Sequence, residues 1–355
     1  MIKNMKRNSE IKKYGPKRTG FVFLILTLVL IAVFLISFML GRYPVPVIQV
    51  LEVFAHRIMK LFGLPGIASV TSEINAVVWN IRLPRILMAC LVGCCLSCAG
   101  ASYQGVFQNP MASPDILGAS NGAAFGAALA ILFGLNSRMI TIASFVSSIV
   151  TVAIVFLVAK YAPGQKTMNL ILAGIMIGSL FSAGTSYIKL VADPSNQLPQ
   201  ITYWLMGSLS GVKLMDFNLV VVGAMAIGCI TLFAIRWKIN LLTLGDEEAR
   251  SLGINTNRLR LIVIIASTLV TAASISVSGV IGWVGLVMPH IARKLVGSNY
   301  RYLIPASMIG GAVFLLVVDN FSRNLLATEI PLGILTAFVG APFFVYLIMK
   351  RTKTF

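Results

Sequence analysis

Charged residues are scarce in this sequence, and acidic residues are the scarcest of all. Only 11% of the 355 residues are charged and only 11 are Asp or Glu, whereas 57% are hydrophobic. Soluble domains carry about 25% charged residues, and a chain with so few cannot cover a surface that faces water. Several apolar runs reach the roughly 20 residues that cross a bilayer as a helix. The composition therefore excludes a soluble globular protein and predicts an all-α polytopic membrane protein.

The apolar runs predict ten membrane spans. We expect them at residues 21–41, 83–104, 115–134, 139–160, 168–190, 214–235, 259–279, 280–297, 302–320 and 331–349. Almost nothing polar separates the seventh from the eighth, so one of the two is expected to be short, broken or re-entrant. The first run is too long for a cleaved signal peptide. The predicted organisation is a basic tail at 1–20, one ten-span domain at 21–349 and a basic tail at 350–355.

The net charge of +18 has a distribution that is typical of a membrane protein. Basic residues precede the first span, follow the last, and form clusters in alternate connections. These clusters are Lys160/Lys166, Arg236/Lys238, Arg250/Arg258/Arg260 and Arg293/Lys294/Arg301. With ten spans, all of them fall on one side, which predicts that both termini are cytoplasmic. The lipid bilayer explains the charge, and we expect no nucleic-acid partner.

The sequence also lacks the groups that would let the chain supply energy or perform catalysis alone. No span interior carries an Asp/Glu/His series for protons or sodium, and Asp319 and Lys189 lie near the outer ends of their spans. There is no phosphate-binding loop, and no HExxH or GxSxG motif. We expect a transport subunit that is not an enzyme, binds no metal or cofactor, and depends on a partner for energy. An ion-coupled carrier and a membrane-embedded enzyme stay open as alternatives.

Four of the five cysteines lie in one span. Cys90, Cys94 and Cys98 recur every four residues and share a helix face, with Cys95 beside it. A metal or haem site is conceivable, but no His, Asp or Glu in the segment completes one. Cysteine is a small hydrophobic residue that suits close helix packing, so packing is the favoured interpretation.

Four polar regions have compositions that a simple connection does not need. Residues 80–85 (NIRLPR) place two arginines around a proline at the outer start of the second span, where they either anchor a helix end or dock an acidic partner. Residues 104–118 form a long loop with two prolines, in which Ser113 is a predicted N-cap and Pro114 the first helical residue. Gly118, Gly122 and Gly126 then predict a close helix contact.

The other two regions belong to the second half of the chain. Residues 241–254 predict a short amphipathic helix outside the bilayer, with acids in its first turn, Arg250 late and Gly253 at its end. A groove on another protein is favoured over the membrane surface, because acidic residues suit anionic lipid poorly. The last region runs through 282–293, 319–323 and 329–333. Its His290 is favoured as a structural hydrogen-bonding residue rather than a metal ligand.

Taken in order, these regions resemble the FecCD permease family of ABC importers, which carry iron-siderophores, haem, vitamin B12 and, in some members, molybdate. The matching pieces are RLPR at 82–85, NPMASPDILGASNGAAFGA at 109–127, the tract 241–254, GLVMPHIAR at 285–293 and EIPLGILTAFVGAPFF at 329–344. Met111 and Trp283 depart from the usual leucine and phenylalanine without disturbing a polar role.

The resemblance implies a type II importer permease of the bacterial cytoplasmic membrane. Its partners would be a second copy of the chain or a close homologue, two cytoplasmic ATPase subunits that hold ATP and Mg, and an extracytoplasmic substrate-binding (lipo)protein. The cargo expected is an iron-siderophore, because this is the commonest in the family, with vitamin B12 or haem as alternatives.

The resemblance also implies roles for individual residues. Arg82, Arg85 and Arg323 match arginines that face acidic residues of the binding protein. Within a loop at about 239–256, the ATPase-coupling residues are Gly245, Asp246, Glu247, Glu248, Ala249, Arg250, Leu252 and Gly253. The cytoplasmic gate corresponds to Pro163, Gly164 and Gln165. Positions with an expected structural role are Asn109, Pro110, Pro114, Gly118, Pro289, His290, Pro331 and Gly333.

Overall fold

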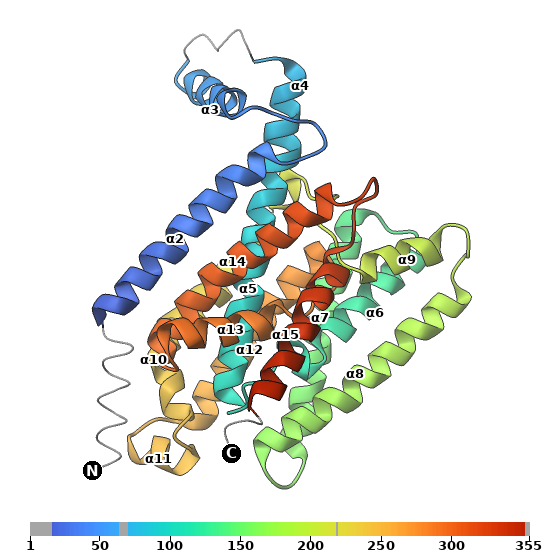
Figure 1. The fold of residues 1–355 in the computed structure, drawn as a ribbon. Coiled ribbons are helices and arrows are strands. Elements are labelled where there is room, and N and C mark those ends of the chain that lie inside the picture. The colour runs from blue at the N-terminus through green and yellow to red at the C-terminus, as the bar shows by residue number, and fades with distance from the viewer. Residues whose placement is uncertain (1–15, 64–69, 218, 352–355) are drawn as a thin grey trace.

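A computed structural model describes residues 16–63, 70–217 and 219–351. Within these ranges every regular element is a helix, and the long helices form one bundle (Figure 1). The start of α2 (Pro16–Met39), the short α11 (Asp246–Ser251) and the end of α15 (Leu332–Arg351) lie at one end, called here the inner end. The helices α3 (Val47–Leu61) and α4 (Ser72–Asn75) lie at the opposite, outer end. Most of the predicted basic tails lies outside the described residues.

Within the described ranges, ten helices overlap the ten predicted spans. Besides α2 and α15 they are α5 (Leu83–Val106), α6 (Ala119–Leu132), α7 (Ser137–Tyr161), α8 (Lys166–Val191), α10 (Leu219–Leu242), α12 (Thr256–Ser278), α13 (Val284–Val296) and α14 (Tyr300–Asn324). Seven helical stretches in the described ranges are long and apolar enough to cross a membrane, and α6 and α15 contribute shorter apolar helices. The predicted polytopic fold is therefore confirmed. The helix α13 has 13 residues, which confirms that one of the seventh and eighth spans is short.

The second span begins well before its predicted start. A continuous helical stretch of 35 residues runs from Ser72 to Val106, and its middle part, Ala76–Arg82, is π-helical. There the Leu83 N–H donates to the Val78 carbonyl, five residues back. Pro84 has no N–H to donate, and the wider π turn before it allows the helix to continue through it. The prediction that residues 80–85 open the span is therefore wrong.

The sixth span is also displaced, since α10 begins at Leu219 and ends at Leu242. Residues Leu214–Asp216, which were predicted to open it, form a separate 3-10 turn, η3. This turn is held by a 2.7 Å hydrogen bond from the Lys213 N–H to the Asp216 carboxylate. A local side-chain bond of this kind competes with the start of a helix.

Helix α5 occupies the centre of the bundle and packs against α10, α12, α13 and α14. Glycines permit its closest contacts. A Cβ atom added to Gly93 would lie 2.2 Å from the Gly311 carbonyl oxygen on α14, and one added to Gly100 would lie 1.8 Å from that of Gly285 on α13. Such small-residue contacts bring helix backbones together in a membrane.

The cysteines of α5 contribute to the same packing. Cys95 and Cys98 are buried, and the Cys95 sulfur lies 3.6 Å from that of Cys229 on α10. In the described part of the chain no group of three His, Cys, Asp or Glu residues is placed to hold a metal ion. The geometry agrees with packing of α5 on α10.

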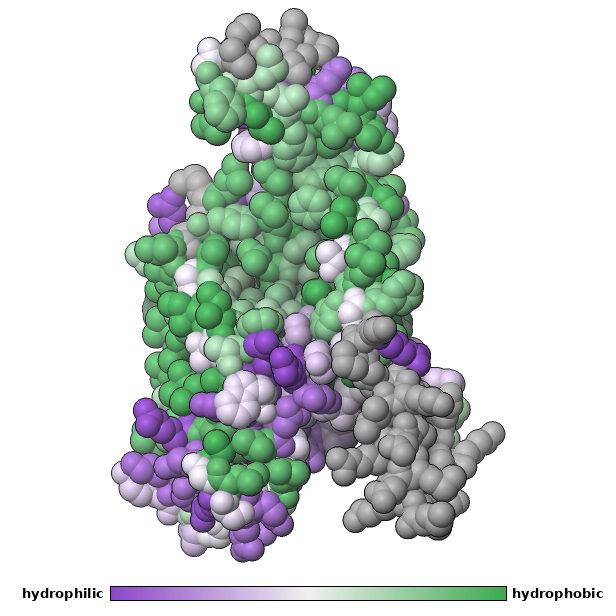
Figure 2. Space-filling model, turned by 90° about the vertical axis from the view of Figure 1, so that its left-hand side faces the viewer, coloured by the Kyte–Doolittle hydropathy of each residue, from purple (hydrophilic) through white to green (hydrophobic). Residues whose placement is uncertain are grey.

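Two of the three glycines predicted to share a face, Gly122 and Gly126, meet α7, whereas Gly118 precedes α6 and lies against α8. A Cβ atom on Gly122 would lie 2.1 Å from the Thr151 hydroxyl, and one on Gly126 would lie 2.4 Å from the Ala143 carbonyl oxygen. On the face shown in Figure 2, the surface is largely apolar between the two ends, and hydrophilic residues gather near the inner end.

Filling the α6–α7 contact should destabilise the fold. We expect Gly126→Val to lower the stability of the detergent-purified protein by about 1–3 kcal/mol, because the added methyl groups must separate two backbones. Gly223→Val on α10 is the matched control, since nothing lies within 4 Å of a Cβ atom there. Thermal unfolding of both variants tests this, and equal melting temperatures would contradict it.

Candidate functional site

The inner end carries the short helix α11, which the sequence predicts at 241–254. Gly245 precedes it with φ 118°, a value that favours glycine. At its other end, Gly253 donates to the Arg250 carbonyl and Ile254 to that of Ala249, which forms a Schellman motif. Ala249 is fully buried. Local turns thus define both ends of α11, and its Ala249 face is buried against the bundle.

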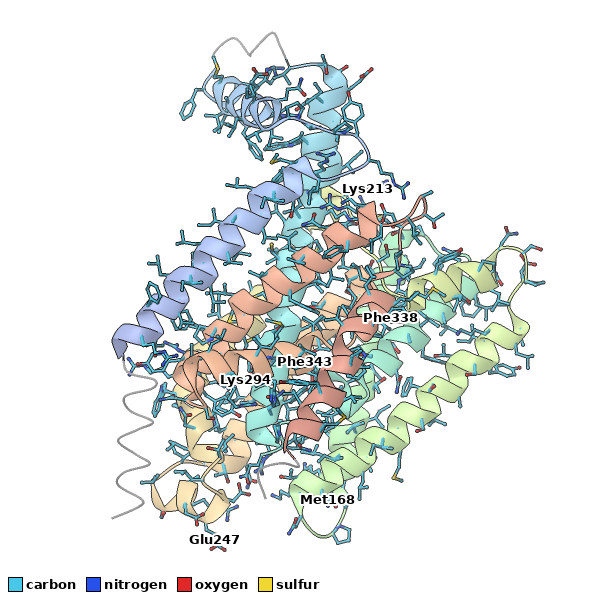
Figure 3. All side chains as sticks on the ribbon, viewed as in Figure 1. Met168, Lys213, Glu247, Lys294, Phe338 and Phe343 are labelled. Atoms are coloured by element: carbon cyan, nitrogen blue, oxygen red, sulfur yellow. The ribbon has the colours of Figure 1, made fainter. Side chains whose placement is uncertain are left out.

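The outward face of α11 is polar and exposed. Glu247, Glu248, Arg250 and Leu252 are all exposed, and Figure 3 shows Glu247 at the extreme inner end of the molecule. Asp246 differs from its neighbours, because its carboxylate accepts a 2.9 Å hydrogen bond from Arg260 at the start of α12. The ion pair joins α11 to the first turns of a long helix.

The predicted gate residues form the tight turn between α7 and α8. Pro163, Gly164 and Gln165 are exposed, and Gly164 has φ 100°. The Asn169 side chain donates to the carbonyls of Ala162 and Pro163 at 3.0 and 3.1 Å. The turn is therefore ordered by the first turn of α8.

The loop before α6 is ordered by turns and by contact with α8. The Ala112 N–H donates to the Asn109 carbonyl at 3.0 Å, so Pro110 occupies a β-turn. Pro114 opens the 3-10 helix η2 (Pro114–Leu117), and Gly118 follows it with φ 74°. A Cβ atom on Gly174 of α8 would lie 2.3 Å from the Ile116 carbonyl oxygen. The structural role of this loop is close packing on α8.

The motif residues of the last spans join separate elements. The Gly333 N–H donates to the Met206 carbonyl at 3.0 Å, and this ties the start of α15, just after Pro331, to the end of α9 (Gln197–Leu205). Pro289 lies inside α13. The next residue, His290, lies with its ring centroid 6.2 Å from Phe343 and 6.1 Å from Phe344 of α15. It therefore contributes to the contact between α13 and α15.

The outer end contains a buried cluster of arginines and carboxylates. The Arg85 guanidinium donates to Asp319 at 2.8 Å and to both oxygens of Glu329 at 2.8 Å. Arg323 lies 3.2 Å from the second oxygen of Asp319. Arg82 donates to the carbonyl of Phe38 at the end of α2 and to that of Tyr43 in the connection that follows. The cluster joins α2, the helical stretch from Ser72 that includes α5, helix α14, and the connection between α14 and α15.

This geometry corrects one expectation. Arg82, Arg85 and Arg323 were expected to be exposed at the outer surface, but they are only 4%, 4% and 7% exposed. Each guanidinium forms hydrogen bonds or ion pairs with groups of the same chain. The carboxylate partners of Arg85 were missed because Asp319 and Glu329 are remote from it in sequence. The four-residue spacing of Asp319 and Arg323 is that of a helical ion pair.

A membrane bundle with helices at the ten predicted spans and a polar helix at its inner end has the architecture of an ABC transporter permease. A solved structure described as an inward-facing conformation of a putative metal-chelate type ABC transporter has this fold, with a TM-score of 0.81 and 36% identity, and the match covers 93% of this chain and 99% of that one. The FecCD transport family matches residues 29–350. The chain belongs to this family, as its motifs predict.

Relatives in the family differ in their named cargo. A putative ABC transporter permease of Methanocaldococcus jannaschii is 39% identical and covers 96% of this chain and 97% of its own. A molybdate import permease of Haemophilus influenzae is 37% identical, with 92% and 95% covered. A hemin transport permease of Yersinia pestis is 38% identical, with 78% and 84% covered.

The buried charge cluster generates a stability prediction. Asp319→Asn leaves two buried arginines without their shared carboxylate, so we expect a loss of about 3–5 kcal/mol. Glu329→Gln should cost less, because the Glu329 side chain is 33% exposed. Thermal unfolding of the two purified variants measures the difference. A loss of stability in Glu329→Gln that equals or exceeds the loss in Asp319→Asn would contradict the prediction.

Proposed function

We propose that this chain is the transmembrane subunit of an ATP-driven importer that moves a bulky metal complex by alternating access. The observation that supports this most is α11, a polar helix held outside the bundle with Glu247, Glu248 and Arg250 exposed. A fixed, charged helix of this kind fits a groove on a partner protein. The Asp246–Arg260 ion pair then transmits motion of that partner into α12.

The partner at α11 is proposed to be one of two cytoplasmic ATPase subunits, which hold ATP and Mg. The inner end would accordingly face the cytoplasm, as the basic clusters indicate, and the membrane would be the cytoplasmic membrane of a bacterium. Closure of the ATPases would displace α11 and change the side to which the pathway opens. The turn at Pro163, Gly164 and Gln165 would then close the inner side.

The pathway is proposed to form between two copies of this chain, or between it and a close homologue. Helices α8 and α15 support this, because both expose apolar faces, including Met176 and Leu180 on α8 and Phe338 and Val339 on α15. Phe338 lies on the outer half of α15 (Figure 3). A weakly polar wall of this sort suits a bulky cargo that a separate protein recognises.

That separate protein is proposed to be an extracytoplasmic substrate-binding (lipo)protein that docks at the outer end. A docking role for Arg82, Arg85 and Arg323 stays a prediction. It requires that these buried arginines exchange the partners they have within this chain. Because Arg85 already holds Glu329, an acidic residue of the binding protein must displace Glu329 to reach it.

The proposed cargo is an iron-siderophore, with vitamin B12 or haem as alternatives. Relatives named for iron chelatin and hemin transport support the first and last of these, and one named for cobalamin import supports the second. Uptake into vesicles that hold the permease, its ATPase and its binding protein decides among them. We expect ATP-dependent uptake of one metal complex, whereas uptake by the permease alone would favour an ion-coupled carrier.

Charge reversal on α11 tests the coupling role. We expect Arg250→Glu to reduce co-purification of the ATPase about tenfold or more, because like charges would meet across the contact. Arg138→Glu, an exposed reversal at the start of α7, is the matched control. The stoichiometry of the purified complex is measured, and full retention with Arg250→Glu would count against the role.

A further inference from the structure

A deep apolar groove lies between α7 and α12. Its cavity measures about 500 Å³, and its walls include Ile149, Val152, Ala153, Ile265 and Leu269. Both helices are apolar enough to span the membrane. A cavity at this depth and with this lining would take up a hydrocarbon chain.

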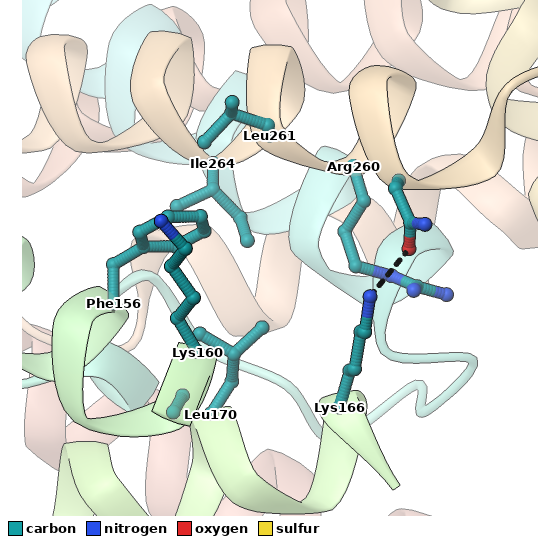
Figure 4. A pocket seen from close by; sticks show the side chains of 9 residues that line it. Phe156, Lys160, Lys166, Leu170, Arg260, Leu261 and Ile264 are labelled. Carbon is teal, nitrogen blue, oxygen red and sulfur yellow. Dashed lines mark hydrogen bonds between the residues drawn. The ribbon is translucent and has the colours of Figure 1, made fainter. Parts of the chain in front are cut away.

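The groove continues into a smaller pocket of different character toward the inner end. This pocket measures about 120 Å³ and shares Phe156, Leu261 and Ile264 with the groove. Its other walls carry three cationic side chains, Lys160 at the end of α7, Lys166 at the start of α8 and Arg260 on α12 (Figure 4). The two adjoining pockets, together called here the channel, are apolar in the groove and carry basic residues at the inner mouth.

The electrostatics of the mouth favour an anion. Helices α8 and α12 both begin there, at Lys166 and Thr256, and helix N-termini attract negative charge. Arg260 is 6% exposed, and its Nε has no hydrogen-bond partner among the described residues.

The charges around Arg260 leave the mouth positive. Its guanidinium donates to Asp246 at 2.9 Å, and Lys166 lies 3.5 Å from the Asn257 side-chain oxygen. Three cations thus line the pocket, and the described residues of its walls include no carboxylate. Lys160 and Lys166 are exposed, so their ammonium groups are accessible to an anion.

We propose that this channel is a binding site for an anionic phospholipid, with an acyl chain in the α7–α12 groove and the phosphate at Lys160, Lys166 and Arg260. An anion alone would not fill the apolar groove, and an apolar ligand alone would leave the cations unmatched. Basic pockets between membrane helices suit anionic headgroups in this way. The site lies between the turn at 162–165 and the Asp246–Arg260 pair, so a bound lipid stabilises the inner ends of α7, α8 and α12 together.

Lipid titration of the purified full chain tests the proposal. Phosphatidylglycerol and phosphatidylcholine with the same acyl chains are added to the protein in neutral detergent, and the melting temperature and retained lipid are measured. We expect phosphatidylglycerol to bind and stabilise preferentially. Lys160→Gln with Lys166→Gln should weaken its apparent affinity about fivefold for each lysine removed.

Matched control variants distinguish an effect at the proposed site from the effects of removing charge or adding side-chain bulk elsewhere. Lys238→Gln with Lys294→Gln removes the same charge from inner-end positions outside the pocket and should leave the affinity unchanged. Ala153→Trp fills the groove and should reduce lipid retention. Ala234→Trp, at an exposed position of α10, should not reduce it.

Three results would overturn the proposal. They are equal stabilisation by the two lipids, unchanged affinity in the Lys160/Lys166 variant, and stabilisation by inorganic phosphate that matches phosphatidylglycerol. The last would indicate a site for a free anion.

Discussion

The close approach of backbones around α5 is the constraint on which the rest of the structure depends. Lipid offers helices no hydrophobic reason to associate, so contact area must come from surfaces that fit. Gly93 and Gly100 let α14 and α13 touch the α5 backbone. Because α5 is central, these contacts fix how closely the start of α13, at Gly285, and the middle of α14, at Gly311, approach it. The positions of the charged groups at both ends follow from this packing.

The two ends use charge in opposite ways. At the outer end, Arg85 and Arg323 are buried against Asp319, and the charges join elements of the same chain. At the inner end, Glu247, Glu248 and Arg250 are exposed on α11, while the Asp246–Arg260 pair connects that helix to the bundle. The outer cluster therefore holds the helices together, and the inner one presents a surface. The proposed function uses this asymmetry, because the partner ATPase would act at the inner end.

Much of the fold could be predicted from the sequence, because the apolar runs that define ten spans are a local signal. The helix α11 was predictable for the same reason, from acids at its start and Gly253 at its end. The π-helical turn before Pro84 was not, since its hydrogen bonds depend on the helix continuing from Ser72. Nor was the burial of Arg85, whose partner Asp319 lies 234 residues away. Long-range pairing of this kind is set by packing, which periodicity does not encode.

The central claim is that a nucleotide-driven partner seated on α11 controls the turn at 162–165. The most direct test places a spin label at Gln165, an exposed residue, in the assembled complex of two permease copies and two ATPases. The distance between the two labels is measured without nucleotide and with ATP bound. The account predicts that the distance changes between the two states and that Arg250→Glu abolishes the change. An identical distance in both states of the intact complex would contradict it.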